Sequence, residues 1–214
     1  MSDTLIEIKN ISKTINKYEI LRNINLDIKI GNIYGIVGRN GSGKSVLLKV
    51  ICGLLSPTSG EILFEGLRMK KGDFIKDIGI LIDSPGMLNQ YSAIKNLEFL
   101  AAINNKITTE DIKEVLTLVG LNPNNDQYVK NYSLGMKQKL GIAQAIMEKP
   151  SFIILDEPMN ALDDYSIEKM RALILSLKKE GRTIILTSHN KEDINLLCDE
   201  VYKIEKGKLK SIKI

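Results

Sequence analysis

Apolar and polar residues alternate in two stretches near the start of the chain, as they do in strands with one buried face. TLIEIKNI (4–11) and INLDIKIG (24–31) both have this period of two. NIYGIVG (32–38) is a more continuous apolar run that ends in glycine, which is typical of a strand buried on both faces. A helical segment, VLLKVICGL (46–54), follows it, and SPTSGEILFEG (56–66) predicts a turn and then a further strand.

The pattern becomes helical from residue 92 to about residue 148. SAIKNLEFLAAIN (92–104) and TTEDIKEVLTLVG (108–120) each predict a helix, and Gly120 is placed to end the second. LNPNNDQYVKN (121–131) is expected to be a loop. It leads to NYSLGMKQKL (131–140), which we interpret as the N-terminus of a basic helix, a place that attracts anions.

Strands and helices alternate in the last third of the chain. SFIILDEP (151–158) and TIILTSH (183–189) predict strands, and KEDINLLCD (191–199) predicts a short helix. VYKIEKGKLKSI (201–212) is typical of a final hairpin. Between the two strands lies an amphipathic helix that ends at Gly181, with one apolar stripe formed by Ile167, Met170, Ile174 and Leu177. Strands separated by helices predict an α/β core with a helical insertion at 92–148.

Composition adds limits to this picture. A chain of 214 residues with 43% hydrophobic and 26% charged residues suits one globular domain. The net charge of +4 is mild and the lysines are scattered, so we expect no nucleic-acid partner. Cys52 and Cys198 have apolar neighbours, which favours two core thiols in a reducing cytosol over a disulfide. The start of the chain does not resemble a signal peptide, and no apolar run is long enough to span a membrane, so we expect a soluble chain.

A phosphate-binding loop is the clearest motif. GRNGSGKS (38–45) fits G-x-x-x-x-G-K-[ST], with a predicted strand before it and a helix after it. In such a loop glycines let backbone N–H groups turn toward phosphates, the lysine contacts the β and γ phosphates, and the serine hydroxyl can bind Mg²⁺. A chance glycine-rich turn is the alternative, but it does not explain the lysine, the serine and both flanks together. The expected nucleotide-binding residues here are Gly38, Arg39, Asn40, Gly41, Ser42, Gly43, Lys44 and Ser45.

Two acidic residues and the only histidine follow predicted strands. Asp156 and Glu157 end the apolar run FIIL, where the first carboxylate can hold Mg²⁺ and the second can polarise a water molecule against the γ-phosphate. Adjacent acids at a strand end are often only a solvated turn, but the phosphate-binding loop upstream favours the functional interpretation. His189 follows TIILTS in the same way. A lone histidine is more often a surface or core residue, and its place one strand beyond the acids favours a catalytic role instead.

Together with NYSLGMKQKL, these residues resemble the ATP-binding subunit of ABC transporters, from about residue 4 to residue 210. The resemblance identifies YSLGMKQKL (132–140), here called the signature segment, as a variant of L-S-G-G-Q. It implies that Ser133, Gly135 and Met136 contact the γ-phosphate of an ATP molecule held by a second subunit, in a head-to-tail dimer. An ordinary capped helix would explain Ser133, but not Gly135 together with a phosphate-binding loop about 90 residues away.

The same resemblance implies the fold and several further roles. It implies a P-loop NTPase (RecA-like) core, formed by 1–83 and 149–214, with an N-terminal antiparallel β subdomain. Residues 84–148 would be an inserted helical subdomain that receives coupling helices from a membrane permease. Asp163 in NALDD would reach across the dimer, and His189 would contact the γ-phosphate and orient the attacking water.

Three positions depart from the usual family pattern. Ile15 stands where an aromatic residue often stacks on adenine, with Tyr18 three residues later, and Val46 stands where threonine is frequent. Asp83 stands at the position of a glutamine that contacts the metal, so we expect a carboxylate ligand to Mg²⁺ there. The alternative is that Asp83 only caps the turn DSPG. An acid at this position and the form of the signature segment are similar to the bacitracin-resistance and lantibiotic-immunity branch, whose members export antimicrobial peptides.

We therefore expect a cytoplasmic ATPase subunit that uses ATP and Mg²⁺ and powers a separate permease at the cytoplasmic face of the membrane. One rival hypothesis is a soluble ABC-type ATPase that acts as a regulatory or nucleic-acid-associated switch. Such proteins usually carry paired cassettes, coiled-coil insertions or zinc motifs, which this sequence lacks. A nucleotide-binding scaffold without turnover is a second rival, and the presence of Glu157 and His189 speaks against it.

Overall fold

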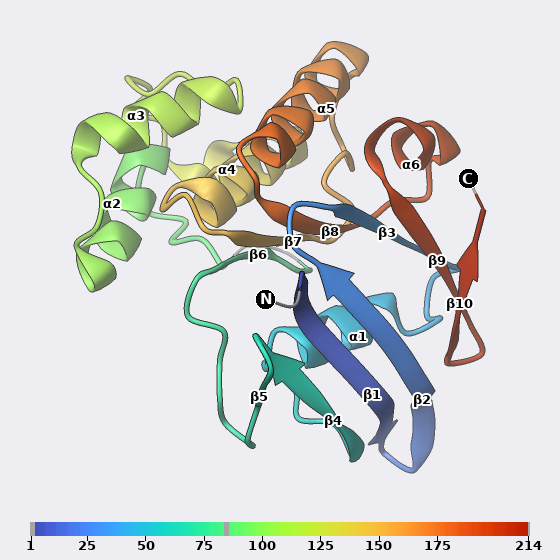
Figure 1. The fold of residues 1–214 in the computed structure, drawn as a ribbon. Helices are drawn as coiled ribbons and strands as arrows, with labels where there is room; N and C mark the ends of the chain where they lie inside the picture. Colours follow the sequence, from blue (N-terminus) through green and yellow to red (C-terminus); the bar gives the residue numbers. More distant parts are fainter. Residues whose placement is uncertain (1–2, 84–85, 214) are drawn as a thin grey trace.

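The computed structural model describes residues 3–83 and 86–213, and it contains two β-sheets (Figure 1). The smaller sheet is antiparallel and has the order β2-β1-β4-β5. Asn16 and Lys17 form the turn between its first two strands, with φ of 47° and 69°, in the left-handed region that a tight hairpin turn needs. Its strands are β1 (Thr4–Ile15), β2 (Tyr18–Lys29), β4 (Ser59–Phe64) and β5 (Leu67–Arg68).

The larger sheet has the order β10-β9-β3-β8-β7-β6. Its strands are β3 (Ile33–Val37), β6 (Ile78–Leu81), β7 (Phe152–Leu155), β8 (Thr183–Thr187), β9 (Glu200–Glu205) and β10 (Lys208–Ile212). All neighbouring strands pair in parallel except β10, which forms the expected C-terminal hairpin with β9. Because β3, β8 and β7 are neighbours and run the same way, the loops at their carboxyl ends meet at one edge of the sheet.

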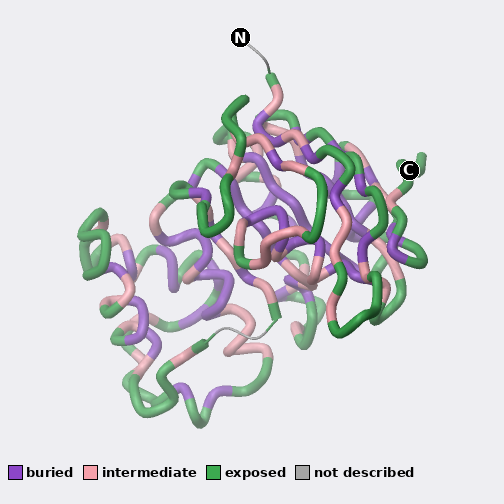
Figure 2. The backbone as a smooth tube through the Cα atoms, turned by 90° about the horizontal axis from the view of Figure 1, so that it is seen from below, coloured by how far each residue is buried: buried purple, intermediate pink, exposed green. Residues whose placement is uncertain are grey.

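The inner strands β3, β7 and β8 of the larger sheet are buried on both faces, as the continuous apolar runs predict. In β7, Phe152 and Ile154 pack on one face, in the cluster that includes the smaller sheet and α1 (Lys44–Ile51). Ile153 and Leu155 pack on the other face, against the remaining helices. Burying one such side chain contributes about 1.5–3 kcal/mol, so the strand is held from both sides. Figure 2 shows these buried segments running through the interior of the molecule.

A short 3₁₀ helix, η1 (Val129–Asn131), lies within the predicted loop 121–131 and has no capping side chain. The other α-helices begin at residues with capping side chains. They are α2 (Ala93–Asn104), α3 (Thr109–Leu118), α4 (Leu134–Ile146), α5 (Asp164–Lys179) and α6 (Lys191–Leu197). Ser92, Thr108, Ser133, Asp163 and Asn190 each accept a hydrogen bond from a backbone N–H group in the first turn of the helix that follows. The predicted ends of α3 and α5 are confirmed, because Gly120 and Gly181 adopt φ of 77° and 85° just beyond them.

The helices of the predicted insertion, α2, α3 and α4, lie together at one side of the molecule (Figure 1). They are joined to the larger sheet where α4 packs on β6. Gly79 in β6 lies so close to the end of α4 that any side chain there would overlap the carbonyl of Ala145. Strand β6 and the two-residue strand β5 were not predicted from the sequence.

The prediction of two core thiols without a disulfide is confirmed, because Cys52 and Cys198 are both buried and free. Burial raises the pKa of the Cys198 thiol to about 12, so it stays protonated at neutral pH. Within residues 3–83 and 86–213, every helix is too short or too polar to cross a membrane.

Candidate functional site

The phosphate-binding loop connects β3 to α1. Gly43 is the N-cap residue of α1 with φ of 109°, and Gly41 has φ of 74°, conformations that cost glycine little and other residues much. No side chain would fit at Gly38 either, because it would run into the carbonyl of Ile204 on β9. The loop thus brings the backbone N–H groups at the start of α1 to the edge of the sheet, where they favour an anion.

Lys44 is buried at the start of this helix, and three groups surround its ammonium. Its Nζ donates to the carbonyl oxygen of Gly38 at 2.9 Å, and it lies 3.5 Å from His189 Nε2 and 3.9 Å from Glu157 Oε1. The charge is therefore held over the loop by the Gly38 carbonyl oxygen, near the Glu157 carboxylate, and a phosphate group can take the place of these oxygens. The contact of Lys44 with the β and γ phosphates, which the motif predicts, stays a prediction.

Asp156 is fixed by two hydroxyl groups. Ser45 Oγ donates to Asp156 Oδ2 and Thr187 Oγ1 donates to Asp156 Oδ1, each at 2.6 Å. Thr187 Oγ1 also accepts a hydrogen bond from the Glu157 N–H at 2.8 Å. A serine hydroxyl beside a carboxylate is the donor set that Mg²⁺ takes from a protein when phosphates and water fill its other positions. Among the described residues no cluster of three or more His, Cys, Asp or Glu side chains could hold a metal ion by itself.

Glu157 and His189 are in direct contact. The Glu157 carboxylate lies with Oε1 3.0 Å from His189 Nε2, and Oε2 accepts from the His189 backbone N–H at 3.3 Å. Burial raises the pKa of Glu157, although the nearby His189 and Lys44 oppose this shift. Glu157 also has φ of 52°, a left-handed conformation that is strained for a residue with a side chain. Raised basicity and a strained backbone at a strand end are both typical of an active site.

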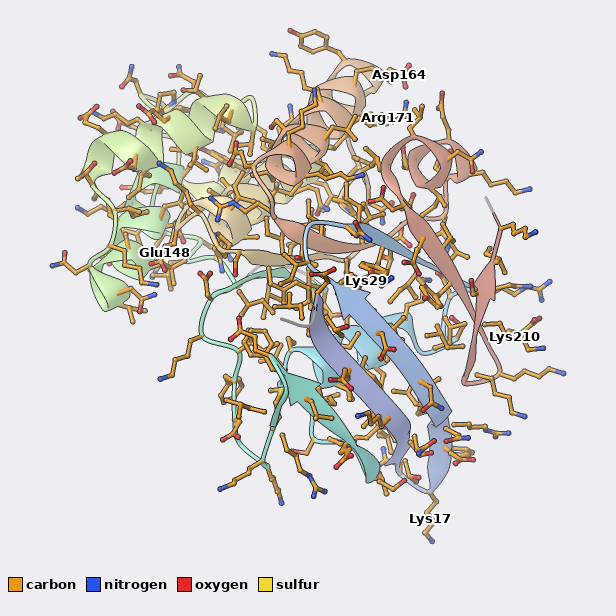
Figure 3. The ribbon with its side chains drawn as sticks, viewed as in Figure 1. Lys17, Lys29, Glu148, Asp164, Arg171 and Lys210 are labelled. Carbon is orange, nitrogen blue, oxygen red and sulfur yellow. The ribbon has the colours of Figure 1, made fainter. Side chains whose placement is uncertain are left out.

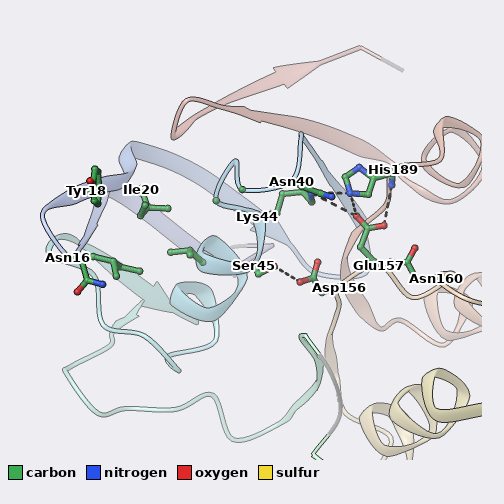
Figure 4. A pocket seen from close by; sticks show the side chains of 14 residues that line it. Asn16, Tyr18, Ile20, Asn40, Lys44, Ser45, Asp156, Glu157, Asn160 and His189 are labelled. Atoms are coloured by element: carbon green, nitrogen blue, oxygen red, sulfur yellow. Dashed lines mark hydrogen bonds and ion pairs between the residues drawn. The ribbon is translucent and has the colours of Figure 1, made fainter. Parts of the chain in front are cut away.

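These groups line one cavity of about 680 Å³ at the carboxyl ends of the parallel strands (Figure 4). Lys44, Ser45, Asp156, Glu157 and His189 gather at one end of it, and side chains of the smaller sheet form the other end. The size suits a nucleotide. The described lining consists of Ile15, Asn16, Tyr18, Ile20, Asn40, Gly41, Gly43, Lys44, Ser45, Val46, Asp156, Glu157, Asn160 and His189.

The far end of the cavity is where the base of a nucleotide is expected. Ile15 lies there, and Tyr18 lies there with 74% of its surface exposed. The two sit on either side of the β1–β2 turn, so an aliphatic and an aromatic side chain share one end of the cavity. Val46, on α1, also lines the cavity.

Three loop residues of the prediction are not among those that line the cavity. Gly38 and Arg39 line a neighbouring cavity of about 480 Å³ on the other side of His189. Ser42 Oγ is buried and has no hydrogen-bond partner in the structure. The loop therefore borders two cavities, and the larger of the two is lined by Lys44, Asp156 and Glu157.

The signature segment lies outside this cavity, because Ser133, Gly135 and Met136 are not among the described lining residues. Ser133 Oγ accepts the Met136 N–H at 3.2 Å, so Ser133 is the N-cap residue of α4. Leu134, next to it, is 71% exposed. The helix N-terminus thus presents its N–H groups to the outside of the chain rather than to the chain's own Lys44.

α4 is nevertheless tied to the loop that carries Glu157. Gln138 Nε2 donates to the backbone carbonyl oxygen of Glu157 at 2.9 Å. A side chain at Gly135 would run into the carbonyl of Ala161, so the helix and this loop are in close contact. Asp163, at the end of the same loop, accepts the Ser166 N–H at 2.8 Å and begins α5.

Asp83 also lies outside the described lining of the cavity. Its Oδ2 is paired with Lys49 Nζ on α1, and its backbone has φ of 58°. The alternative role, capping the turn DSPG, involves residues 84–85, which lie outside the described residues. The structure therefore places the carboxylate beside a lysine, and its binding to Mg²⁺ stays a prediction.

Several site residues were missed by the sequence analysis. Thr187, Gln138, Asn160, Asn16 and Ile20 line the cavity or hold its acids. Thr187 ends an apolar strand beside His189, and that position was a signal that could have identified it. Gln138 carries no signal of its own, since its contact with Glu157 depends on how α4 packs.

Comparison with known proteins agrees with this geometry. Residues 21–160 match the ABC transporter family. The chain is 38% identical to the lantibiotic transport ATP-binding protein SrtF of Streptococcus pyogenes, over 96% of this chain and 89% of that protein. It is 40% identical to the bacitracin transport ATP-binding protein BcrA of Bacillus licheniformis, over 96% of this chain and 68% of that protein.

The fold is similar to that of a solved dimeric bacterial ABC transporter cassette. The TM-score is 0.86 and the identity is 25%, with 98% of this chain and 99% of the other chain covered. The cavity, the lysine, the two acids and the histidine therefore stand in a fold that binds and hydrolyses ATP. The chain belongs to the ABC transporter family, as an ATP-hydrolysing ATP-binding subunit of the branch that includes the lantibiotic and bacitracin transport proteins.

Proposed function

We propose that two copies of this subunit enclose ATP head to tail, and that hydrolysis powers a separate permease that exports, or gives immunity to, an antimicrobial peptide. This proposal rests on one observation: a single chain does not bring all the predicted ATP-contacting residues to the same place. Lys44, Glu157 and His189 gather in the cavity, whereas Ser133 lies outside it at an exposed helix N-terminus. The signature segment of a second chain would supply the contacts to the γ-phosphate that this chain's own segment, which lies outside the cavity, does not make.

Within each site, the chain's residues position the phosphates of ATP and polarise the attacking water. The N–H groups of the phosphate-binding loop and the Lys44 ammonium hold the β and γ phosphates. Ser45 and Asp156 would hold Mg²⁺, which supplies charge neutralisation on the phosphate oxygens when it is bound. Glu157, which contacts His189 in this structure, accepts a proton from the attacking water, and His189 contacts the γ-phosphate and orients that water. The attack is in line, and positioning together with electrostatics supplies most of the acceleration.

The partner's signature segment completes the site in this proposal. Ser133, Gly135 and Met136 of one chain contact the γ-phosphate bound by the other, and Asp163 lies at the same interface. The positive end of α4 favours an anion, and the exposed Leu134 beside it supports burial against a second chain. ATP binding closes the dimer, and hydrolysis and phosphate release reopen it.

The permease partner places the subunit at the cytoplasmic face of the membrane. The similarity to lantibiotic and bacitracin transport proteins supports an antimicrobial peptide as the transported molecule. The helical part of the chain, residues 84–148 in the sequence prediction, is the proposed contact with the permease.

The test is resistance in cells. The subunit is expressed with the permease encoded beside it in a sensitive bacterium, and growth is measured against a lantibiotic and against bacitracin. We expect the wild type to raise the tolerated concentration of one of them, Lys44→Ala to abolish the effect, and Lys210→Ala, an exposed lysine on β10, to keep it. Absence of a resistance difference between wild type and Lys44→Ala for both peptides would contradict the proposed substrate, and failure to co-purify with the permease would contradict the transport role.

A further inference from the structure

A buried ion pair lies behind His189. Arg171 on α5 donates from Nε at 2.9 Å and from Nη2 at 2.6 Å to Asp193 Oδ1 on α6. The side chains are only 8% and 2% exposed. Figure 3 labels Arg171 on α5, beside α6. Glu168 and Glu192, both exposed, contact the same guanidinium from the solvent side.

The second oxygen of Asp193 reaches the loop that carries the histidine. Ser188 Oγ donates to Asp193 Oδ2 at 2.9 Å, and the same Oγ accepts the Asn190 N–H at 3.0 Å. Ser188 and Asn190 are the two neighbours of His189 in the chain. The backbone on both sides of His189 is therefore tied to a network that ends at a buried guanidinium.

Stability alone is a weak reason for such a pair. Removing two charges from water costs several kcal/mol, and an apolar pair of similar volume is often as stable. A buried, fully hydrogen-bonded pair does, however, hold its side chains and the backbone bonded to them in a single arrangement. Here the geometry belongs to the short turn between β8 and α6, where Ser188 and Asp193 are the buried polar residues among 188–193.

We propose that Arg171, Asp193 and Ser188 are positioning residues for His189, and that their network sets the place of its imidazole against Glu157. The network touches neither the cavity lining nor the expected phosphates, so it acts through the turn 188–190. Loss of the network lets the turn move, and the 3.0 Å contact between His189 Nε2 and Glu157 Oε1 is lost with it. This inference rests on the role proposed above for His189.

The test uses the fact that His189 is the only histidine of the chain. After removal of any purification tag, the imidazole C–H signals in a carbon–proton NMR spectrum belong to this residue alone. Spectra are recorded without nucleotide for the wild type, Ser188→Ala, Asp193→Asn and Glu192→Gln. Ser188→Ala breaks the link to the turn while Arg171 and Asp193 stay paired. Glu192→Gln is the matched control, because it alters a partner of Arg171 that has no bond to Ser188.

We expect Ser188→Ala and Asp193→Asn to shift or broaden the His189 signals, and Glu192→Gln to leave them in place. In ATPase assays the first two variants should lose on the order of tenfold to a hundredfold in kcat, because small displacements of a catalytic group cost this much, while KM changes little. His189 signals that match the wild type in both folded variants would overturn the proposal. Shifted signals with unchanged kcat would keep the positioning role and contradict the catalytic role of His189 instead.

Discussion

Asp83 and Lys49 form an ion pair, with Oδ2 of the aspartate 2.5 Å from Nζ of the lysine. Lys49 lies on α1 four residues after Ser45, so the two side chains are on the same side of the helix. The carboxylate that the sequence assigns to Mg²⁺ is therefore held one helical turn away from the expected metal site. The Asp83 side chain is 57% exposed, so its carboxylate can leave Lys49 for another cation. Lys49 and Mg²⁺ are two cations that can compete for it.

The competition predicts a change in Mg²⁺ dependence. In Lys49→Met, Asp83 loses its protein cation and is available to the metal, so less Mg²⁺ should be needed for half-maximal ATPase activity. An exposed pair is worth at most about 1 kcal/mol, which corresponds to a shift of roughly fivefold or less. Titration of ATPase activity with Mg²⁺ measures it, and Asp83→Gln in the Lys49→Met background should remove the shift. Superimposable curves for wild type and Lys49→Met would leave Asp83 without a role at the metal.

Glu157→Gln should bind ATP without hydrolysing it. The amide keeps the size and hydrogen bonding of the side chain but cannot accept a proton, and loss of a general base costs about a hundredfold to ten-thousandfold in rate. Because closure needs ATP and opening needs hydrolysis, the variant should elute as an ATP-bound dimer in size-exclusion chromatography. Glu114→Gln, an exposed residue of α3, is the control and should behave as the wild type. Turnover by Glu157→Gln near the wild-type rate would remove Glu157 from the mechanism.

The same substitution predicts a pH-dependent gain in stability without nucleotide. Burial raises the pKa of Glu157 in the folded protein, so keeping the carboxylate charged costs stability above that pKa. The cost declines as pH falls through the folded pKa and is gone below the unfolded value of about 4.3. Glu157→Gln should therefore melt at a higher temperature than wild type at pH 7, and the difference should shrink toward pH 4. An equal difference at both pH values would contradict the raised pKa, and Glu114→Gln again serves as control.

Sharing of each site between two chains predicts complementation. Ser133→Asp keeps an oxygen acceptor for the Met136 N–H, so α4 stays capped, but it puts a negative charge where the partner's γ-phosphate is expected. Ser133→Asp and Lys44→Ala should each be inactive alone, and mixing them should restore part of the ATPase activity, because one composite site of the mixed dimer is intact. Ser133→Thr is the matched control and should stay active. Full activity of the Ser133→Asp protein alone would mean that each chain holds a complete site.

Much of this architecture could be predicted because its determinants are local. The glycines of 38–45 encode a turn that few other residues permit, and the apolar runs before Asp156 and His189 encode buried strands. The strand β6 was missed because four residues, IGIL, carry too little periodic pattern. The contacts of Thr187 and Gln138 were missed for another reason. They join residues 30 and 19 positions apart, and only the packing of strands and helices brings them together.

The hydrogen bond from Gln138 to the carbonyl of Glu157 has a consequence for how two sites would work together. In the proposed dimer, α4 of each chain faces the ATP of its partner, and Gln138 on this helix is hydrogen-bonded to the backbone of Glu157 in the chain's own site. A shift of α4 when it meets the partner's γ-phosphate would therefore also move the backbone of Glu157. Binding of ATP at one site would then affect the second site through the first turn of α4, which ends near Gln138. The dimer, with one nucleotide site per subunit, would therefore bind ATP cooperatively, with a Hill coefficient above one. Gln138→Ala would bring that coefficient back toward one.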